Sequence, residues 1–173
     1  KIEKNAQPAN MAGFKWLAGY YNYTNGSIHT GRYPIYPKDN TLNAFRRLSR
    51  GLQQPVKISF NNIRTRQQLA KRLGEQLMID STEIAGKLFS SEFQKEMGYT
   101  DEAVISLFIT NTYEVYWNIS VDELLKRMQK EHQRFWTEER VAKAKAIYLS
   151  PEQVSTLASI VEEETNNNPE KPT

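Results

Sequence analysis

The spacing of apolar residues in the first third of the chain changes from a β-type pattern to a helical one and back. Residues 29–36 are rich in β-favouring Tyr and Ile, and Pro34 places this expected strand at a sheet edge. Asp39 or Asn40 can cap the helix that follows, in which apolar residues recur at helical spacing. Residues 55–60 alternate again. The pattern therefore predicts a compact strand–helix–strand unit.

Beyond this unit the pattern is helical, and the expected helices open on capping sequences. Thr65 with Gln68, and Ser120 with Glu123, have the spacing at which two residues satisfy each other's exposed amides. Another short helix is expected to open at Asp80. The helix after Ser120 is expected to be long and to reach Ile147.

The last expected helix has the clearest start. Ser150 caps it, Pro151 occupies the first position, where a missing amide costs nothing, and Gln153 completes the capping box. We expect the polar run that begins at Asn166 to end it.

The fold class predicted from these patterns is α+β. We expect residues 1–25 to be a lead-in, with residues 14–18 forming a helical turn or a short strand. Residues 26–62 would form the strand–helix–strand subdomain, and residues 63–173 a mainly helical region.

Composition narrows the function without choosing it. Apolar residues make up 39% and charged residues 25% of the chain, which is typical of a packed protein. There are no cysteines, and His29 and His132 are far apart, so we expect no metal site. Residues 1–80 hold 13 Lys/Arg against 4 Asp/Glu, and residues 81–173 hold 10 against 16. A basic front half suggests an anionic partner: nucleic acid, a membrane surface or peptidoglycan.

Two glutamates of the last helix lie where charge is costly. With Val161 as reference, a step of 100° per residue places Glu162 at roughly +100°, at the margin of the apolar stripe, and Glu164 at roughly −60°, inside it. A carboxyl in such a place gains a cationic partner or holds its proton near neutral pH. The first outcome is structural, whereas the second suits the general acid of glycoside cleavage.

The run Ala158-Ser159-Ile160-Val161-Glu162-Glu163-Glu164-Thr165 resembles a motif of the endolytic murein transglycosylases, the YceG-like family. The family has lysine where this chain has Glu163. The resemblance implies that Glu162 is the catalytic glutamate and that Glu164 is the second acidic residue of the site.

Two further segments resemble the same family. Residues 107–116 are similar to a family segment with Pro and Asp where this chain has Thr110 and Asn111, so an ionised role at position 111 is not carried over. Asn111 and Tyr113 are the substrate-binding candidates there. The alternative for the aromatic residues of this stretch is a β-rich core.

Residues 26–60 resemble the LysM-like subdomain of the family, in which LysM modules bind N-acetylglucosamine polymers. The resemblance implies a glycan-binding role for this subdomain. Tyr33, Tyr36 and Asn40 are the candidate contacts, through aromatic faces and amide hydrogen bonds.

The resemblance implies lytic cleavage of the glycan between N-acetylmuramic acid and N-acetylglucosamine, giving 1,6-anhydro ends. The resemblance implies that neither a metal nor an organic cofactor is required. The partners that it implies for the chain are peptidoglycan strands and cell-wall synthesis proteins, and not nucleic acid. The implied location is the bacterial inner membrane, with a single-pass anchor upstream of Lys1 and this portion facing the periplasm.

Family members continue with further active-site segments. We therefore expect a catalytic domain that is truncated at Thr173 and inactive by itself. The alternatives are a non-catalytic peptidoglycan-binding module and a basic nucleic-acid-binding domain, although no helix-turn-helix, zinc or RNA-binding signature supports the latter.

Overall fold

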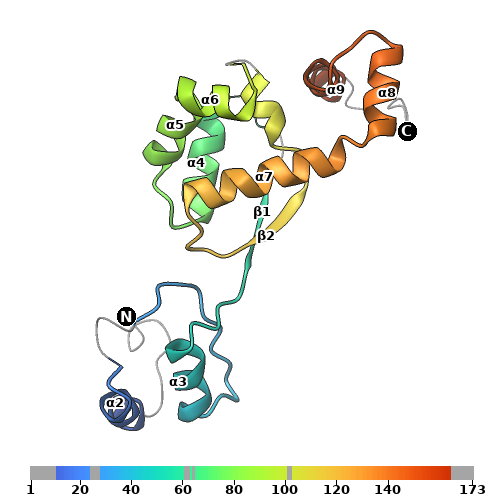
Figure 1. Cartoon of the computed structure of the whole chain (residues 1–173). Coiled ribbons are helices and arrows are strands. Elements are labelled where there is room, and N and C mark those ends of the chain that lie inside the picture. Colours follow the sequence, from blue (N-terminus) through green and yellow to red (C-terminus); the bar gives the residue numbers. More distant parts are fainter. Residues whose placement is uncertain (1–10, 24–27, 61–62, 64, 101–102, 165–173) are drawn as a thin grey trace. The chain divides into compact units, whose positions relative to one another are not determined.

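The computed structural model describes residues 11–23, 28–60, 63, 65–100 and 103–164, and for Glu163, Glu164 and Met97 it describes the backbone alone. Within these residues it holds eight α-helices, one 3-10 helix and one two-stranded antiparallel sheet (Figure 1). The predicted α+β class with a mainly helical body is confirmed.

The chain divides into two compact units. Unit 1 comprises residues 1–58 and 113–119, and unit 2 comprises residues 59–112 and 120–173. Two of the unit boundaries in the sequence, after residues 58 and 112, fall within the two strands of the sheet.

Unit 1 contains two helices that pack against each other, α2 (Met11–Tyr20) and α3 (Thr41–Ser49). α2 settles the open choice for residues 14–18 in favour of a helix. α3 begins as predicted, because Asn40 is extended and its Oδ1 accepts a hydrogen bond from the backbone N–H of Asn43 at 2.8 Å.

The expected first strand, residues 29–36, is wrong: this segment forms no strand. It runs instead along the loop after α3, where the Gln54 N–H donates to the Arg32 carbonyl at 2.9 Å. A Cβ at Gly31 would lie 2.3 Å from the Gln53 side chain, so a larger residue here would require that flexible side chain to shift. Pro34 has no N–H for a ladder, and its carbonyl accepts from the Arg47 guanidinium at 2.7 Å. Contacts with Arg47 of α3 and with the loop after α3 thus take the place of strand pairing.

The second expected strand is confirmed as β1 (Val56–Ser59), but its partner comes from a distant part of the sequence. That partner is β2 (Thr112–Val115). Both strands alternate, with Val56 and Ile58 buried on β1 and Tyr113 and Val115 buried on β2.

Unit 2 packs its helices around one apolar core. Its first elements are α4 (Arg66–Gln76), α5 (Ser81–Phe89), α6 (Ser91–Met97), the 3-10 helix η2 (Ala103–Leu107) and α7 (Val121–Phe135). Fully buried side chains come from each of α4, α5, η2 and α7; they include Leu69, Leu73, Ile84, Leu88, Val104, Leu107, Leu124, Leu125 and Met128. The predicted caps Thr65, Asp80 and Ser120 start α4, α5 and α7.

The long helix expected from Ser120 to Ile147 is wrong, because α7 ends at Phe135. A separate helix, α8 (Glu138–Ala146), follows the break at Trp136. Thr137 caps α8, its Oγ1 accepting from the Arg140 N–H at 3.4 Å. A threonine followed by two glutamates was a start signal that the sequence analysis missed.

Candidate active site

Glu162 lies in the last turn of α9 (Pro151–Glu164), whose start is as predicted. The Ser150 N–H donates to Gln153 Oε1 at 2.8 Å, and the Gln153 N–H donates to Ser150 Oγ at 3.3 Å. This reciprocal cap sets where the helix begins, and so sets the turn on which Glu162 falls.

The apolar stripe of α9 is not buried among the described residues, contrary to expectation. Leu157 is 48% exposed, Ile160 54% and Val161 37%, and Glu162 is exposed as well. Glu164 is the last residue of α9, and its side chain lies outside the described residues, so its predicted place inside the stripe remains a prediction. Helical periodicity predicts which residues of α9 share a face, but it does not predict whether another element covers that face.

α9 packs against η2 and α8 within unit 2. η2 ends at Leu107, the residue at which the segment 107–116 begins, and Leu107 itself is fully buried. Phe108 follows in the core with its ring edge-on to Phe60, at a centroid distance of 5.4 Å. The start of the segment 107–116 therefore lies in the same unit as α9, whereas its residues 113–116 belong to unit 1.

Asn111 and Tyr113 follow in the same segment, with different surroundings. Asn111 is exposed; its Oδ1 accepts from the Thr112 N–H at 2.7 Å and its carbonyl from the Phe60 N–H at 3.4 Å. The Tyr113 side chain is only 5% exposed, in β2. Of the two candidates, Asn111 is the one that presents a side chain to solvent.

Like Tyr113, the other substrate-binding candidates lie in unit 1. The Tyr33 hydroxyl donates to the His29 carbonyl at 3.0 Å, and partial burial raises the pKa of this phenol. The Asn40 side chain caps α3. Tyr36 is 52% exposed, with the Arg47 guanidinium 5.2 Å from its ring centroid.

Sequence reasoning missed the ion pair that organises this region. The Arg47 guanidinium donates to both carboxylate oxygens of Asp39, with Nη2 3.2 Å from Oδ1. The Arg47 hydrogen bond, aided by the Tyr36 N–H, lowers the pKa of Asp39. Arg47 lies eight residues after Asp39, on α3, and the sequence analysis considered Asp39 only as a possible helix cap.

A polar cluster at the end of α7 was also missed. The Tyr99 hydroxyl lies 3.0 Å from Nδ1 of His132, and Trp136 lies beside that imidazole. Burial raises the pKa of Tyr99 to about 12 and lowers the pKa of His132, while the Glu152 carboxylate at the start of α9 partly opposes the latter shift. Within the part of the chain that the structure describes, His132 Nε2 and Trp136 Nε1 are buried without a hydrogen-bond partner.

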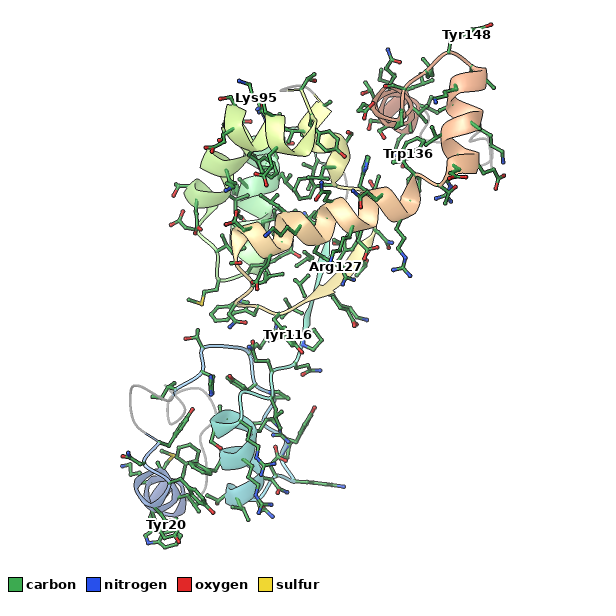
Figure 2. The ribbon with its side chains drawn as sticks, viewed as in Figure 1. Tyr20, Lys95, Tyr116, Arg127, Trp136 and Tyr148 are labelled. Atoms are coloured by element: carbon green, nitrogen blue, oxygen red, sulfur yellow. The ribbon has the colours of Figure 1, made fainter. Side chains whose placement is uncertain are left out.

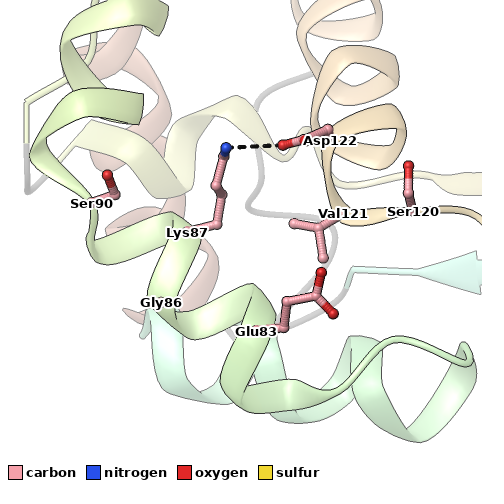
Figure 3. Close-up of a pocket in the computed structure, with 7 residues that line it drawn as sticks. All are labelled: Glu83, Gly86, Lys87, Ser90, Ser120, Val121 and Asp122. Carbon is pink, nitrogen blue, oxygen red and sulfur yellow. Dashed lines mark ion pairs between the residues drawn. The ribbon is translucent and has the colours of Figure 1, made fainter.

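A small polar pocket of about 260 Å³ lies between α5 and the start of α7 (Figure 3). Lys87 Nζ crosses it to Asp122 Oδ1 at 3.0 Å, and Glu83 lines it. The Asp122 hydrogen bond raises the pKa of Lys87. The pocket contains none of the predicted site residues.

Fold and site together define a mainly helical α+β protein with an acidic residue at the exposed end of a capped helix. Comparison with protein families places all of residues 1–173 in the YceG-like family, so the chain belongs to that family, which is a family of transglycosylases. No curated protein and no solved structure matches the chain.

The described ranges contain no group of three or more His, Asp or Glu side chains that could hold a metal ion. None of the helices there has the length and apolar character needed to cross a membrane.

Proposed function

We propose that the chain is part of an endolytic peptidoglycan lytic transglycosylase with Glu162 as its general acid and base. The supporting observations are the family match over residues 1–173 and the exposed position of Glu162 in the last turn of α9. Residues 158–165 carry the run that resembles the family motif, and membership of a transglycosylase family supports the same reaction class.

In the proposed reaction one carboxyl serves twice. Glu162 donates its proton to the glycosidic oxygen as the bond from muramyl C1 to that oxygen breaks. The carboxylate then accepts the proton of the muramyl C6 hydroxyl while that oxygen bonds to C1. The product is a 1,6-anhydro sugar, the acid is restored and no water is consumed. A second carboxylate, as used by hydrolytic glycosidases, is therefore not required.

The surroundings of Glu162 suit a polymeric substrate. Its exposed position on the last turn of α9 leaves the carboxyl accessible to a glycan strand. Asn111 would offer its amide to a sugar hydroxyl, and Glu164 would orient the neighbouring groups.

The test is release of 1,6-anhydromuramyl products from purified peptidoglycan, measured by mass spectrometry. The protein is used with whatever sequence its gene encodes on either side of residues 1–173. We expect Glu162→Gln to lower the rate by about 100-fold or more, because an amide cannot transfer the proton. Glu163→Gln is the matched control, since helical spacing predicts that position 163 lies on the side opposite the apolar stripe, and it should retain activity. Full activity of Glu162→Gln would refute the assignment.

For residues 26–62 we propose glycan binding, the non-catalytic part of the same function. Tyr33, Tyr36 and Asn40 are the proposed contacts. The exposed ring of Tyr36, steadied by Arg47, supports this role. Retention of the chain on insoluble peptidoglycan measures it, and a Tyr36→Ala form that is retained equally well would remove Tyr36 from the site.

From the family we also propose a place at the bacterial inner membrane facing the periplasm, with cell-wall synthesis proteins as partners. Cell fractionation tests the location, and recovery of the protein in the cytoplasmic fraction alone would contradict it.

A further inference from the structure

α2 and Tyr21, the residue that follows it, carry a cluster of large aromatic side chains exposed to solvent. Trp16 is 67% exposed, Tyr20 71% and Tyr21 61%. The rings of Trp16 and Tyr20 are nearly parallel, with an interplanar angle of 14° and centroids 5.5 Å apart, and Tyr21 meets Tyr20 edge-on at 5.1 Å. We call these three residues the α2 aromatic platform. Figure 2 shows the Tyr20 side chain projecting away from α3.

Aromatic contacts with Phe45 of α3 hold the platform in place. Phe14 packs edge-on against Phe45 of α3 at 5.7 Å, and Tyr21, itself a platform residue, also contacts that ring at 5.5 Å. Tyr23 closes the end of the helix, its ring 5.6 Å from Phe45 and its N–H bonded to the Ala18 carbonyl at 2.8 Å. Because these contacts fix α2 on α3, the exposed rings are held in place before any ligand arrives, which lowers the entropy cost of binding.

An exposed cluster of this kind indicates a binding surface, because adjacent large apolar groups in water are costly and uncommon on a monomer. The residue types indicate what is bound. Tyr and Trp combine an apolar face with a polar edge, and their electron-rich faces attract C–H groups with partial positive charge. A pyranose ring offers such C–H groups on its flat face and hydroxyls at its rim, and so matches both parts of these side chains.

Charge narrows the choice to an anionic glycan. The described residues of unit 1 hold seven Lys/Arg (Lys15, Arg32, Lys38, Arg46, Arg47, Arg50 and Lys57) against Asp39 and Glu114. This excess complements the carboxylates of peptidoglycan. A membrane surface fits less well, because α2 has ten residues and a single lysine, whereas interfacial helices carry several cations beside a long apolar face.

We propose that the α2 aromatic platform is a glycan-binding subsite for peptidoglycan, in which Trp16 and Tyr20 stack on sugar rings. It lies outside residues 26–62 and does not involve Glu162. The identity of the glycan rests on the proposed function. The subsite would hold a strand to the protein without taking part in bond cleavage.

The experiment measures retention of the full chain on insoluble peptidoglycan and its affinity for a soluble N-acetylglucosamine hexamer. Trp16→Ala with Tyr20→Ala should weaken both by about tenfold, whereas Trp16→Phe with Tyr20→Phe should largely restore binding because the stacking faces remain. Tyr148→Ala is the matched control: it removes a side chain that is 95% exposed in unit 2 and should change nothing.

Additional measurements distinguish loss of glycan binding from unfolding, from membrane binding and from loss of catalysis. Circular dichroism melting of the double alanine form should match that of the wild type, since both side chains are exposed. Unchanged glycan binding by the double alanine form would overturn the proposal, as would platform-dependent binding to phosphatidylglycerol vesicles without glycan binding. Loss of activity in Glu162→Gln with intact glycan retention would concern the proposed reaction and leave the subsite standing.

Discussion

At the residue scale, His132 is the titratable group that the fold perturbs in the physiological range. Its imidazole is 8% exposed and bonded through Nδ1 to the Tyr99 hydroxyl. Burial lowers its pKa below the ordinary 6.5, and the Glu152 carboxylate only partly opposes this. The unfolded chain therefore binds a proton at a higher pH than the folded chain does.

The stability contributed by neutral His132 is fully present above the unfolded pKa of 6.5 and is lost as the pH falls through the lower folded pKa. We expect the free energy of unfolding in urea to drop as the pH is lowered from neutral through 6.5 and below. His132→Gln keeps a hydrogen-bond partner for Tyr99 but does not titrate, so it should show a clearly smaller drop. An identical drop in both proteins would assign the effect to other groups.

At the scale of the elements, two glycines differ in backbone conformation: one lies inside a helix and the other ends a helix. Gly86 lies inside α5, and a Cβ built there meets nothing within 4 Å. Gly98 ends α6 in the left-handed region at φ +75°, also with open space around it. Steric crowding is thus absent at both positions, and only backbone preference differs.

The same substitution should therefore have opposite effects at the two positions. Gly86→Ala is expected to raise the free energy of unfolding by about 0.5–1 kcal/mol, because alanine loses less entropy in a helix. Gly98→Ala is expected to lower it by about 1–2 kcal/mol, because a Cβ strains a positive φ. Urea denaturation of both variants checks the pair, and shifts of the same sign would contradict these helix bounds.

At the scale of the whole molecule, apolar residues of similar type differ in what surrounds them. Leu73 of α4 is fully buried in the core of unit 2, while Leu157 of α9 is 48% exposed. Both lie on the apolar stripe of a helix, so the sequence pattern does not distinguish them.

Replacing each leucine with alanine should lower the free energy of unfolding by very different amounts at the core and surface positions. Leu73→Ala should cost about 2–5 kcal/mol through lost burial and a cavity. Leu157→Ala should change stability by no more than about 0.5 kcal/mol. Equal and large losses in a denaturation experiment would mean that α9 is covered in solution by something that hides Leu157.

The sequence by itself determined most helix starts. The caps at Thr65, Asp80, Ser120 and Ser150 lie where the pattern placed them, and of the two candidates Asp39 and Asn40 it is Asn40 that caps α3. A cap joins a side chain to an amide two or three positions later. Because this contact is local in sequence, it can be predicted from the sequence alone. The same holds for the turn of α9 that carries Glu162. The break at Trp136 was predictable too, since Thr137 is another local cap.

Only the tertiary structure decided which elements meet. The pairing of β1 with β2, the loss of the strand expected at residues 29–36 and the joining of Tyr99 to His132 all depend on contacts between distant positions. Helical spacing marked Glu162 at the edge of an apolar stripe, but the described fold leaves that stripe exposed. Periodicity records which residues share a face, whereas burial depends on whether another part of the molecule reaches that face.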